Sequence, residues 1–409
     1  VEYEPETIPI LKIIELRMKY SYQRDLRYMI KHIERDEYKN INIKTANIYM
    51  IQQALHICWT SSMENIMSLK DGSRILDKLK HHLKHISDQI DVLIPSYKSA
   101  TNSTHATSNL LLLLIEVRDK IDHVIKKHIR TIDSFGWYSL VRTYLSSSDK
   151  SAATTKVGSS EIKHENEFIG GYSRAIITPL TYRCIQAMYM SSVGMLHGAI
   201  LQGANQLGNY RDGIVFDMAA YLGKTYVPLY CTPLMDSNEI IRIMKGIVSL
   251  GAWALFKSPR KLSVNVTQTI ATIVSHVQIA YQESVENIYV GKQEIQFCKP
   301  TFFFVTRGSG KSTLPMTQGY TPIQFSRPNF GLVSELLLVT YGFKDARILS
   351  LKLVACLVAY GLEPQVQKVV ERSATLLNDA LKSGSKNSIG DSKEIDEGAI
   401  ISAALNSFV

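Results

Sequence analysis

The sequence predicts an α/β protein in which a helical N-terminal segment precedes a parallel sheet with flanking helices and then a helical C-terminal part. Three observations carry this prediction. Residues from about 8 to 145 place apolar side chains at helical spacing and show almost no strand pattern. After about residue 165, short apolar runs alternate with helical stretches, which is typical of a parallel sheet covered on both faces. From about 331 to 382 the pattern is helical again.

Four helices are expected in the N-terminal segment. The first begins with a stripe that starts at Ile10, and the second follows the stripe from Ile48 to Cys58. The third follows the stripe from Leu76 to Leu93 and should end at Pro95, and the fourth runs from about 108 to 131. The Ser-rich stretch 146–160 is polar and unpatterned, so we expect a linker or surface loop there.

The strands of the sheet are expected in four short apolar runs. These are Ala175–Ile177, Thr225–Leu229, Ala252–Phe256 and Thr301–Val305. Helices are expected between them, at about 181–195, 213–223, 238–249 and 264–282. The tail from Lys382 to Glu397 is rich in Ser, Gly and Lys, which predicts a mobile segment.

The composition is that of an ordinary globular protein. Of 409 residues, 45% are hydrophobic and 20% charged, which excludes disorder throughout. The net charge of +9 favours acidic partners but is spread too thinly to indicate nucleic-acid binding. The start of the chain lacks a secretory signal, and Leu110–Ile115, the longest apolar run, is too short for a membrane span. We therefore expect a soluble cytosolic chain with reduced cysteines and, since no initiator Met is present, a fragment of a larger protein.

The string Arg307-Gly308-Ser309-Gly310-Lys311-Ser312-Thr313 ends as a phosphate-binding loop does. However, Val305 stands where that pattern needs its first glycine. The residues that follow include Pro315 and Pro322, which oppose the helix whose N-terminus would hold the phosphate. We expect an ordinary loop here, and the alternative is a working P-loop NTPase that uses Gly308–Ser312 with Lys311.

A weaker candidate is a metal site on the third helix. His81 and His85 are one helical turn apart, with Asp88 near them. A solvated helix face explains the same spacing, and we favour it. The cysteines show no zinc-binding spacing.

Four strings occur along the chain in a fixed order. They are Ser134-Phe135-Gly136-Trp137, Ile177-Thr178-Pro179-Leu180-Thr181, Gly251-Ala252-Trp253 and Phe325-Ser326-Arg327-Pro328. In this order they resemble the end of the linker and three segments of the first AAA+ module of dynein heavy chains. The resemblance covers about residue 110 to the C-terminus. It implies a helical linker segment, an AAA+ P-loop-type parallel sheet with flanking helices, and a helical small subdomain.

By this resemblance, the chain divides into four parts. Residues 1–150 would be the helical linker end and 151–165 a Ser-rich loop. Residues 166–330 would be the large α/β subdomain of the module, and 331–409 its helical small subdomain with a mobile tail.

The family's P-loop sequence, G-T-G-K-T, falls by position on Gly208-Asn209-Tyr210-Arg211-Asp212. Tyr210 replaces a loop glycine and would obstruct the approach of phosphate to the backbone. Arg211 replaces the lysine, a change from a compact ammonium to a planar fork. Asp212 replaces the threonine that ligates Mg²⁺ and would put a carboxylate beside a polyphosphate, at a cost of about 4 kcal/mol per like-charge contact.

The family's Walker B acids fall on Lys257 and Ser258, so both carboxylates are missing. The sensor asparagine of the family falls on Thr306, and the sensor arginine falls near Gln367. These changes together predict that the module does not hydrolyse ATP.

The family's adenine-facing turn is kept, since Ile177, Thr178, Pro179 and Leu180 are all present. In the family this turn packs on the base. A second interpretation, which we weigh equally, is that these residues only fix the linker end to the sheet.

The resemblance implies a motor-region fragment whose family role is ATP-driven movement along microtubules. The implied partners are neighbouring AAA+ modules of a dynein ring, other dynein complex subunits and, indirectly, microtubules, with no nucleic acid and no membrane. ATP and Mg²⁺ are the family's cofactors, and none is expected for this chain. The implied location is the cytoplasm and cytoskeleton, including the axoneme of the cilium. The alternatives are the working NTPase and a scaffold without a motor partner.

Overall fold

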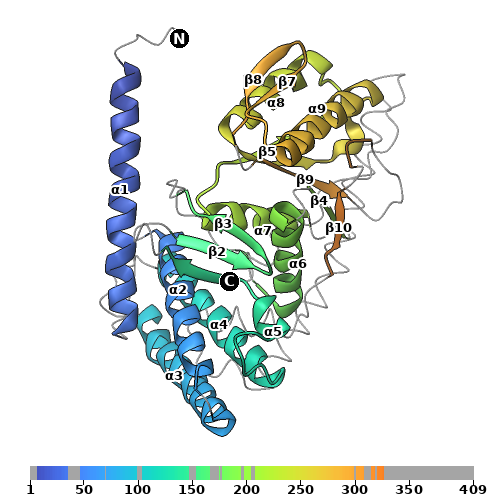
Figure 1. The fold of residues 1–409 in the computed structure, drawn as a ribbon. Helices are drawn as coiled ribbons and strands as arrows, with labels where there is room; N and C mark the ends of the chain where they lie inside the picture. Colours follow the sequence, from blue (N-terminus) through green and yellow to red (C-terminus); the bar gives the residue numbers. More distant parts are fainter. Residues whose placement is uncertain are drawn as a thin grey trace.

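The computed structural model shows a helical N-terminal part beside a part built on a parallel sheet (Figure 1). The residues that it describes are 7–35, 47–69, 71–98, 104–146, 153–165, 175, 177–194, 198–203, 208–298, 301–307, 315–317 and 320–326. The predicted Gly308–Ser312 loop, the helical region 331–382, Gln367 and the tail to 409 lie outside the described residues.

All four helices predicted for the N-terminal part are present. They are α1 (Thr7–Glu34), α2 (Ile48–Met67), α3 (Gly72–Lys98) and α4 (Thr104–Lys126). The side chain of Asn47 caps α2 by accepting a hydrogen bond from the Tyr49 N–H at 2.9 Å. The predicted end of α3 at Pro95 is wrong, since the helix continues to Lys98. Proline has no backbone N–H and so removes one helical hydrogen bond. Pro95 lies in the last turn of α3, so this loss affects only the end of the helix and does not stop it at Pro95.

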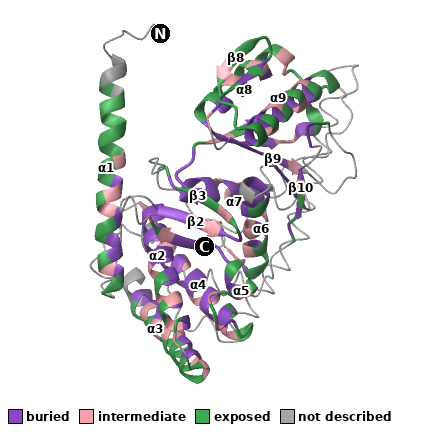
Figure 2. Cartoon of the chain, viewed as in Figure 1, coloured by how far each residue is buried: buried purple, intermediate pink, exposed green. Residues whose placement is uncertain are grey.

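The helices of the N-terminal part share one hydrophobic core. The apolar run of α4 lies in this core, where Leu110, Leu111 and Leu114 are fully buried. The short helix α5 (Phe135–Tyr138) inserts Trp137 against Trp59, with 5.3 Å between the ring centroids. By contrast, Ile10 and residues 12–18 of α1 are exposed (Figure 2).

The Ser-rich stretch is not the featureless loop that the sequence predicts. An antiparallel sheet is formed by β1 (Arg142–Leu145), β2 (Ala153–Val157) and β3 (Ser160–Lys163). A two-residue turn joins β2 to β3, and Gly158 takes the positive φ of 58° that such turns need. Serine and lysine made the stretch look polar, but the β-branched residues Thr154, Thr155 and Val157 pair well in a sheet and are buried.

The predicted parallel α/β sheet is confirmed. Its strands are β4 (Ala199–Gln202), β5 (Tyr226–Tyr230), β6 (Trp253–Lys257), β9 (Phe302–Arg307) and β10 (Thr321–Gln324). They are arranged in the order β10-β4-β9-β6-β5, and every neighbouring pair is parallel. The central strands β6 and β9 are nearly continuous apolar runs because both of their faces are covered.

The apolar runs located three of these strands to within two residues. The strand predicted at Ala175–Ile177 is wrong, because Ala175 and Ile177 lie outside any strand. They lead instead into the capped start of α6 (Pro179–Tyr189). The strands β4 and β10 and the hairpin of β7 (Asn287–Val290) and β8 (Gln293–Gln296) were missed. Each has only four residues, too few for a clear period.

Helices cover both faces of the parallel sheet (Figure 1). On one side lie α8 (Ser237–Leu250) and α9 (Val264–Glu283), and on the other lie α6 and α7 (Gly208–Tyr221). The helix α7 has no polar face because it contacts two cores: Val215 and Met218 pack in the sheet core, and Ala220 packs in the helical core. This helix therefore joins the two parts of the protein.

None of the described helices combines the length and the apolar character needed to cross a membrane. Within the described ranges, no group of three or more His, Cys, Asp or Glu residues is placed to hold a metal ion, so the metal interpretation of His81 and His85 is not supported. Cys58 and Cys231 are free thiols. Burial raises the pKa of each to about 12, so both thiols stay protonated at neutral pH.

Candidate functional site

Five of the predicted site residues lie at the carboxyl edge of the parallel sheet. Arg211 and Asp212 are the fourth and fifth residues of α7, Lys257 ends β6, Ser258 follows it, and Thr306 is in β9. The chain crosses over at β4, which lies between β10 and β9, and ligands of parallel α/β sheets bind outside the strand ends at such a point. Gly208, also predicted, begins α7. We call the five residues the α7 site.

Arg211 turns back toward the end of strand β4. Its Nη1 donates to the carbonyl oxygens of Leu201 at 3.2 Å and Gly203 at 3.4 Å. The residue is only 4% exposed. The guanidinium is therefore held by the main chain of the strand end rather than extended into solvent.

Asp212 and Lys257 form an ion pair across the α7 site. The Lys257 Nζ lies 2.8 Å from Asp212 Oδ2, and the two side chains are 19% and 13% exposed, respectively. The pair joins the N-terminal part of α7 to the last residue of β6, two segments far apart in the sequence. At this depth an ion pair is screened less by salt than a surface pair is.

The aromatic ring of Tyr230 completes the surroundings of Lys257. The Lys257 Nζ donates to the Tyr230 hydroxyl at 3.2 Å and lies 4.6 Å from the centroid of the ring. Burial opposes the charge on Lys257, but the hydrogen bond and negative charge of Asp212, helped by Tyr230, raise its pKa above the ordinary lysine value. Lys257 is therefore a cation at neutral pH.

Ser258 and Thr306 tie together the ends of β6 and β9. The Ser258 N–H donates to Thr306 Oγ1 at 3.4 Å, and that hydroxyl donates to the Phe256 carbonyl at 3.2 Å. Ser258 has a φ of 53°, in the left-handed region that residues other than glycine seldom adopt. Thr306 thus uses its hydroxyl to hold this turn.

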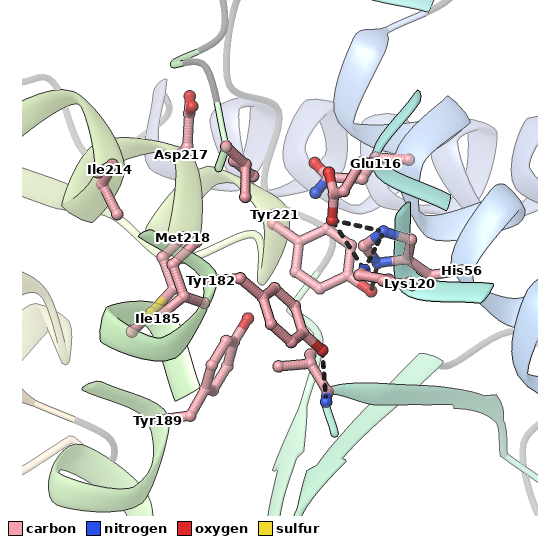
Figure 3. A pocket seen from close by; sticks show the side chains of 13 residues that line it. His56, Glu116, Lys120, Tyr182, Ile185, Tyr189, Ile214, Asp217, Met218 and Tyr221 are labelled. Carbon is pink, nitrogen blue, oxygen red and sulfur yellow. Dashed lines mark hydrogen bonds and ion pairs between the residues drawn. The ribbon is translucent and has the colours of Figure 1, made fainter. Parts of the chain in front are cut away.

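The Ile177–Leu180 turn lies at the start of α6. Thr178 caps the helix, with its Oγ1 accepting from the Thr181 N–H at 3.3 Å, and Pro179 is the first helical residue. Leu180 is 47% exposed. Ile177 lines a cavity between α6, α7 and the helices α2 and α4 (Figure 3).

This cavity is small and mixed in character (Figure 3). Its volume is about 30 Å³, room for one or two water molecules. Apolar side chains of α6 and α7, such as Ile185 and Met218, line one side, and polar residues of α2 and charged residues of α4 line the other. A cavity of this volume holds water and is too small for a nucleotide base.

The charged side of the cavity belongs to a buried polar cluster that the sequence did not predict. We call it the junction cluster: Gln53, His56, Glu116, Lys120, His164 and Tyr221. The Lys120 Nζ lies 2.7 Å from Glu116 Oε1 and 3.0 Å from His56 Nε2. His56 Nε2 also lies 3.2 Å from Glu116 Oε1, and His56 Nδ1 and the Tyr221 hydroxyl share a hydrogen bond of 3.0 Å.

His164 forms the other end of the junction cluster. Gln53 Nε2 donates to His164 Nδ1 at 2.8 Å and to the Tyr221 carbonyl at 2.7 Å, and His164 Nε2 then donates to Thr155 Oγ1 at 2.8 Å. Burial, followed by the positive charge of Lys224, lowers the pKa of His164 to about 3. The cluster joins α2 and α4 to α7 and β2, and so fixes the helical part to the sheet part.

His164 should make the stability of this junction depend on pH. Its folded pKa of about 3 is below the unfolded value near 6.5, so its contribution is complete above pH 6.5 and is lost as the pH falls. We expect the unfolding free energy of the wild type, relative to the His164→Gln variant, to fall by about 2 kcal/mol between pH 7.5 and 5. Urea unfolding at both pH values measures this, and a difference that does not change with pH would contradict it.

One sequence signal could have located the junction cluster. Glu116 and Lys120 are four residues apart and follow the apolar run Leu110–Ile115 directly. Two opposite charges at this spacing on a buried helix are expected to form an ion pair inside the protein. The roles of His56 and His164 had no comparable local signal, because their partners come from distant segments.

Comparison with known proteins identifies the sheet part. The family described as "Hydrolytic ATP binding site of dynein motor region" matches residues 164–370, just over half of the chain. Dynein axonemal heavy chain 1 of Homo sapiens is 26% identical over 255 residues, which cover 60% of this chain and 6% of the relative.

Two further relatives match a longer part of the chain. The ciliary dynein beta chain of Tripneustes gratilla is 26% identical over 317 residues, and the flagellar inner arm I1 dynein-1-beta heavy chain of Chlamydomonas reinhardtii is 27% identical over 319 residues. Each match covers 75% of this chain and 7% of the relative, so the chain spans only a small fraction of these proteins. The parallel sheet and the match to residues 164–370 together show that the chain belongs to the dynein heavy-chain motor family.

Proposed function

We propose that the chain is part of a dynein-type motor heavy chain and that its own AAA+ module is a structural member of the motor that does not hydrolyse ATP. The family role is ATP-driven movement along microtubules. The observation that carries the second half of the proposal is the Asp212–Lys257 ion pair.

The residues of the α7 site do not fit a magnesium-bound nucleotide. P-loop enzymes hold Mg²⁺ with a Ser or Thr hydroxyl of the loop and a carboxylate of the Walker B strand. By position these are Asp212 and Lys257, and the ammonium of Lys257 already lies 2.8 Å from Asp212. Ser258 has no carboxylate to activate water, and Thr306 is bonded to the Phe256 carbonyl.

A structural role agrees with how the module is joined to the helical part. The helix α7 contacts both hydrophobic cores, and the junction cluster links it to α2 and α4. We propose that residues 1–150 are the end of the linker, 166–330 the large subdomain and 331–409 the small subdomain. The Ile177–Leu180 turn would then fix the linker end to the module rather than hold a base.

Partners and location are proposed from the relatives. Their names place them in axonemes, cilia and a flagellar inner arm complex. We propose that this chain likewise acts in the cytoskeleton and the axoneme, against neighbouring AAA+ modules and other dynein complex subunits. Contact with microtubules would be indirect, and ATP and Mg²⁺ would act at other modules of the motor.

Phosphate release from Mg·ATP tests the proposal. The 409-residue chain should show no magnesium-dependent release above the buffer rate, because the α7 site lacks both Walker B carboxylates. Sustained turnover that is lost in a Lys311→Ala variant would contradict the proposal and assign the activity to the Gly308–Ser312 loop. Turnover lost instead on Arg211→Ala would contradict it and assign the activity to the α7 site.

A further inference from the structure

The Asp212–Lys257 pair occupies a special place in the fold. Asp212 is the fifth residue of α7, a helix of 14 residues whose N-terminal end lies at the carboxyl edge of the sheet. In P-loop enzymes a hydroxyl at the start of this helix is one of the protein ligands of Mg²⁺. By position that ligand is Asp212 in this chain, and its carboxylate contacts the Lys257 ammonium instead of a metal.

The cation of the pair comes from the adjacent strand. Lys257 ends β6, the strand whose carboxylate holds Mg²⁺ in P-loop enzymes. Its ammonium is placed by two elements at once, by Asp212 of α7 at 2.8 Å and by the Tyr230 hydroxyl of β5 at 3.2 Å. Three segments of the sheet part therefore meet at one ammonium group.

The formal charges agree with replacement of the Mg²⁺ by the Lys257 ammonium. Arg211, Asp212 and Lys257 together carry a charge of +1. A P-loop lysine, two Walker B carboxylates and one Mg²⁺ also sum to +1. The side chains alone therefore change from −1 in the family to +1 in this chain, a gain of two positive charges that equals the charge of one Mg²⁺.

We propose that the Asp212–Lys257 pair is a built-in substitute for the Mg²⁺ that P-loop enzymes hold between these two positions, and that it holds the N-terminal part of α7 on the end of β6 without any ligand. This deepens the proposed function and rests on it, since the module must not need Mg·ATP at this place. Lys257 acts here as a positioning residue. The ion-pair link between α7 and β6 is present in this chain without nucleotide or metal.

A double-mutant cycle on the 409-residue chain tests the proposal. Asp212→Asn and Lys257→Met should each reduce the folding equilibrium constant about tenfold, and the double variant should lose little more than either one. Lys257→Arg, which keeps the charge, should recover most of the loss. The control is the same cycle on Asp122 and Lys126, whose exposed pair has Nζ and Oδ2 2.6 Å apart and should couple less than about threefold.

Magnesium supplies a second measurement, which does not require every variant to fold. Addition of Mg²⁺ should leave the unfolding midpoint of the wild type unchanged, because the cation position is filled. The proposal is overturned if the two substitutions are additive, if Lys257→Arg behaves like Lys257→Met, or if Mg²⁺ stabilises the wild type. ATP turnover by the wild type would overturn the proposed function. If the chain shows no turnover but the Asp212 and Lys257 substitutions are additive, only the proposal that the pair substitutes for the metal is overturned.

Discussion

Replacing Lys120 by methionine is expected to lower the free energy of unfolding by about 3–5 kcal/mol. Lys120 is 5% exposed, and its partner Glu116 is 8% exposed, so the substitution leaves a carboxylate buried without its cation. The ammonium also lies 5.4 Å from the centroid of the Trp59 ring, a favourable contact that is lost as well. Urea unfolding followed by tryptophan fluorescence measures the change next to the cluster.

A matched control lies on the same helix. Lys126 pairs with Asp122 at 2.6 Å, but its side chain is 72% exposed, so Lys126→Met should change the stability by less than about 0.5 kcal/mol. The double variant Glu116→Leu with Lys120→Met should be more stable than Lys120→Met alone, since no charge is then stranded. If Lys120→Met costs no more than Lys126→Met, the junction cluster does not stabilise the fold.

Much of the fold could be predicted because its strongest signals are local. The buried strand β6 is a run of apolar residues before Lys257, and α9 is a long helix with a capping Ser263, so sequence alone located both. The β2–β3 hairpin was missed because its buried threonines look polar. Its partner β1 is close in the sequence, but Arg142–Leu145 has only four residues, too few for a clear period.

The sequence predicted the individual residues of the α7 site but not the contacts among them. Resemblance to the family singled out Asp212 and Lys257 as separate departures, each harmful to Mg·ATP binding. Their contact of 2.8 Å required the fold, since α7 and β6 are brought together only by the parallel sheet. In the same way, Arg211 has the charge of a P-loop cation, but its bonds to the Leu201 and Gly203 carbonyls appear only in the structure.

Restoring the family residues should create a nucleotide site on this scaffold. The combined variant carries Tyr210→Gly, Arg211→Lys, Asp212→Thr, Lys257→Asp and Ser258→Glu. We expect it to bind Mg·ATP about a thousandfold more tightly than the wild type, because one like-charge contact worth about 4 kcal/mol is removed and the metal ligands return. Isothermal titration calorimetry measures the affinity, and little turnover is expected from this module alone.

Single substitutions provide the control for this variant. Asp212→Thr alone should lower stability and add no binding, since it leaves Lys257 without its carboxylate at the place of the metal. The five changes act on one ion and one phosphate, so their effects should be strongly coupled. If the fivefold variant folds and still binds no Mg·ATP, the assignment of the P-loop to Gly208–Asp212 is wrong.

Titration of the unaltered chain with ATP, once with Mg²⁺ and once with EDTA, tests the central claim most directly. If the Asp212–Lys257 pair fills the place of the metal, binding should be weaker than about 1 mM in both titrations, and Mg²⁺ should not improve it. An affinity in the micromolar range or tighter that requires Mg²⁺ would show that the pair opens to admit metal and nucleotide, and would contradict the account.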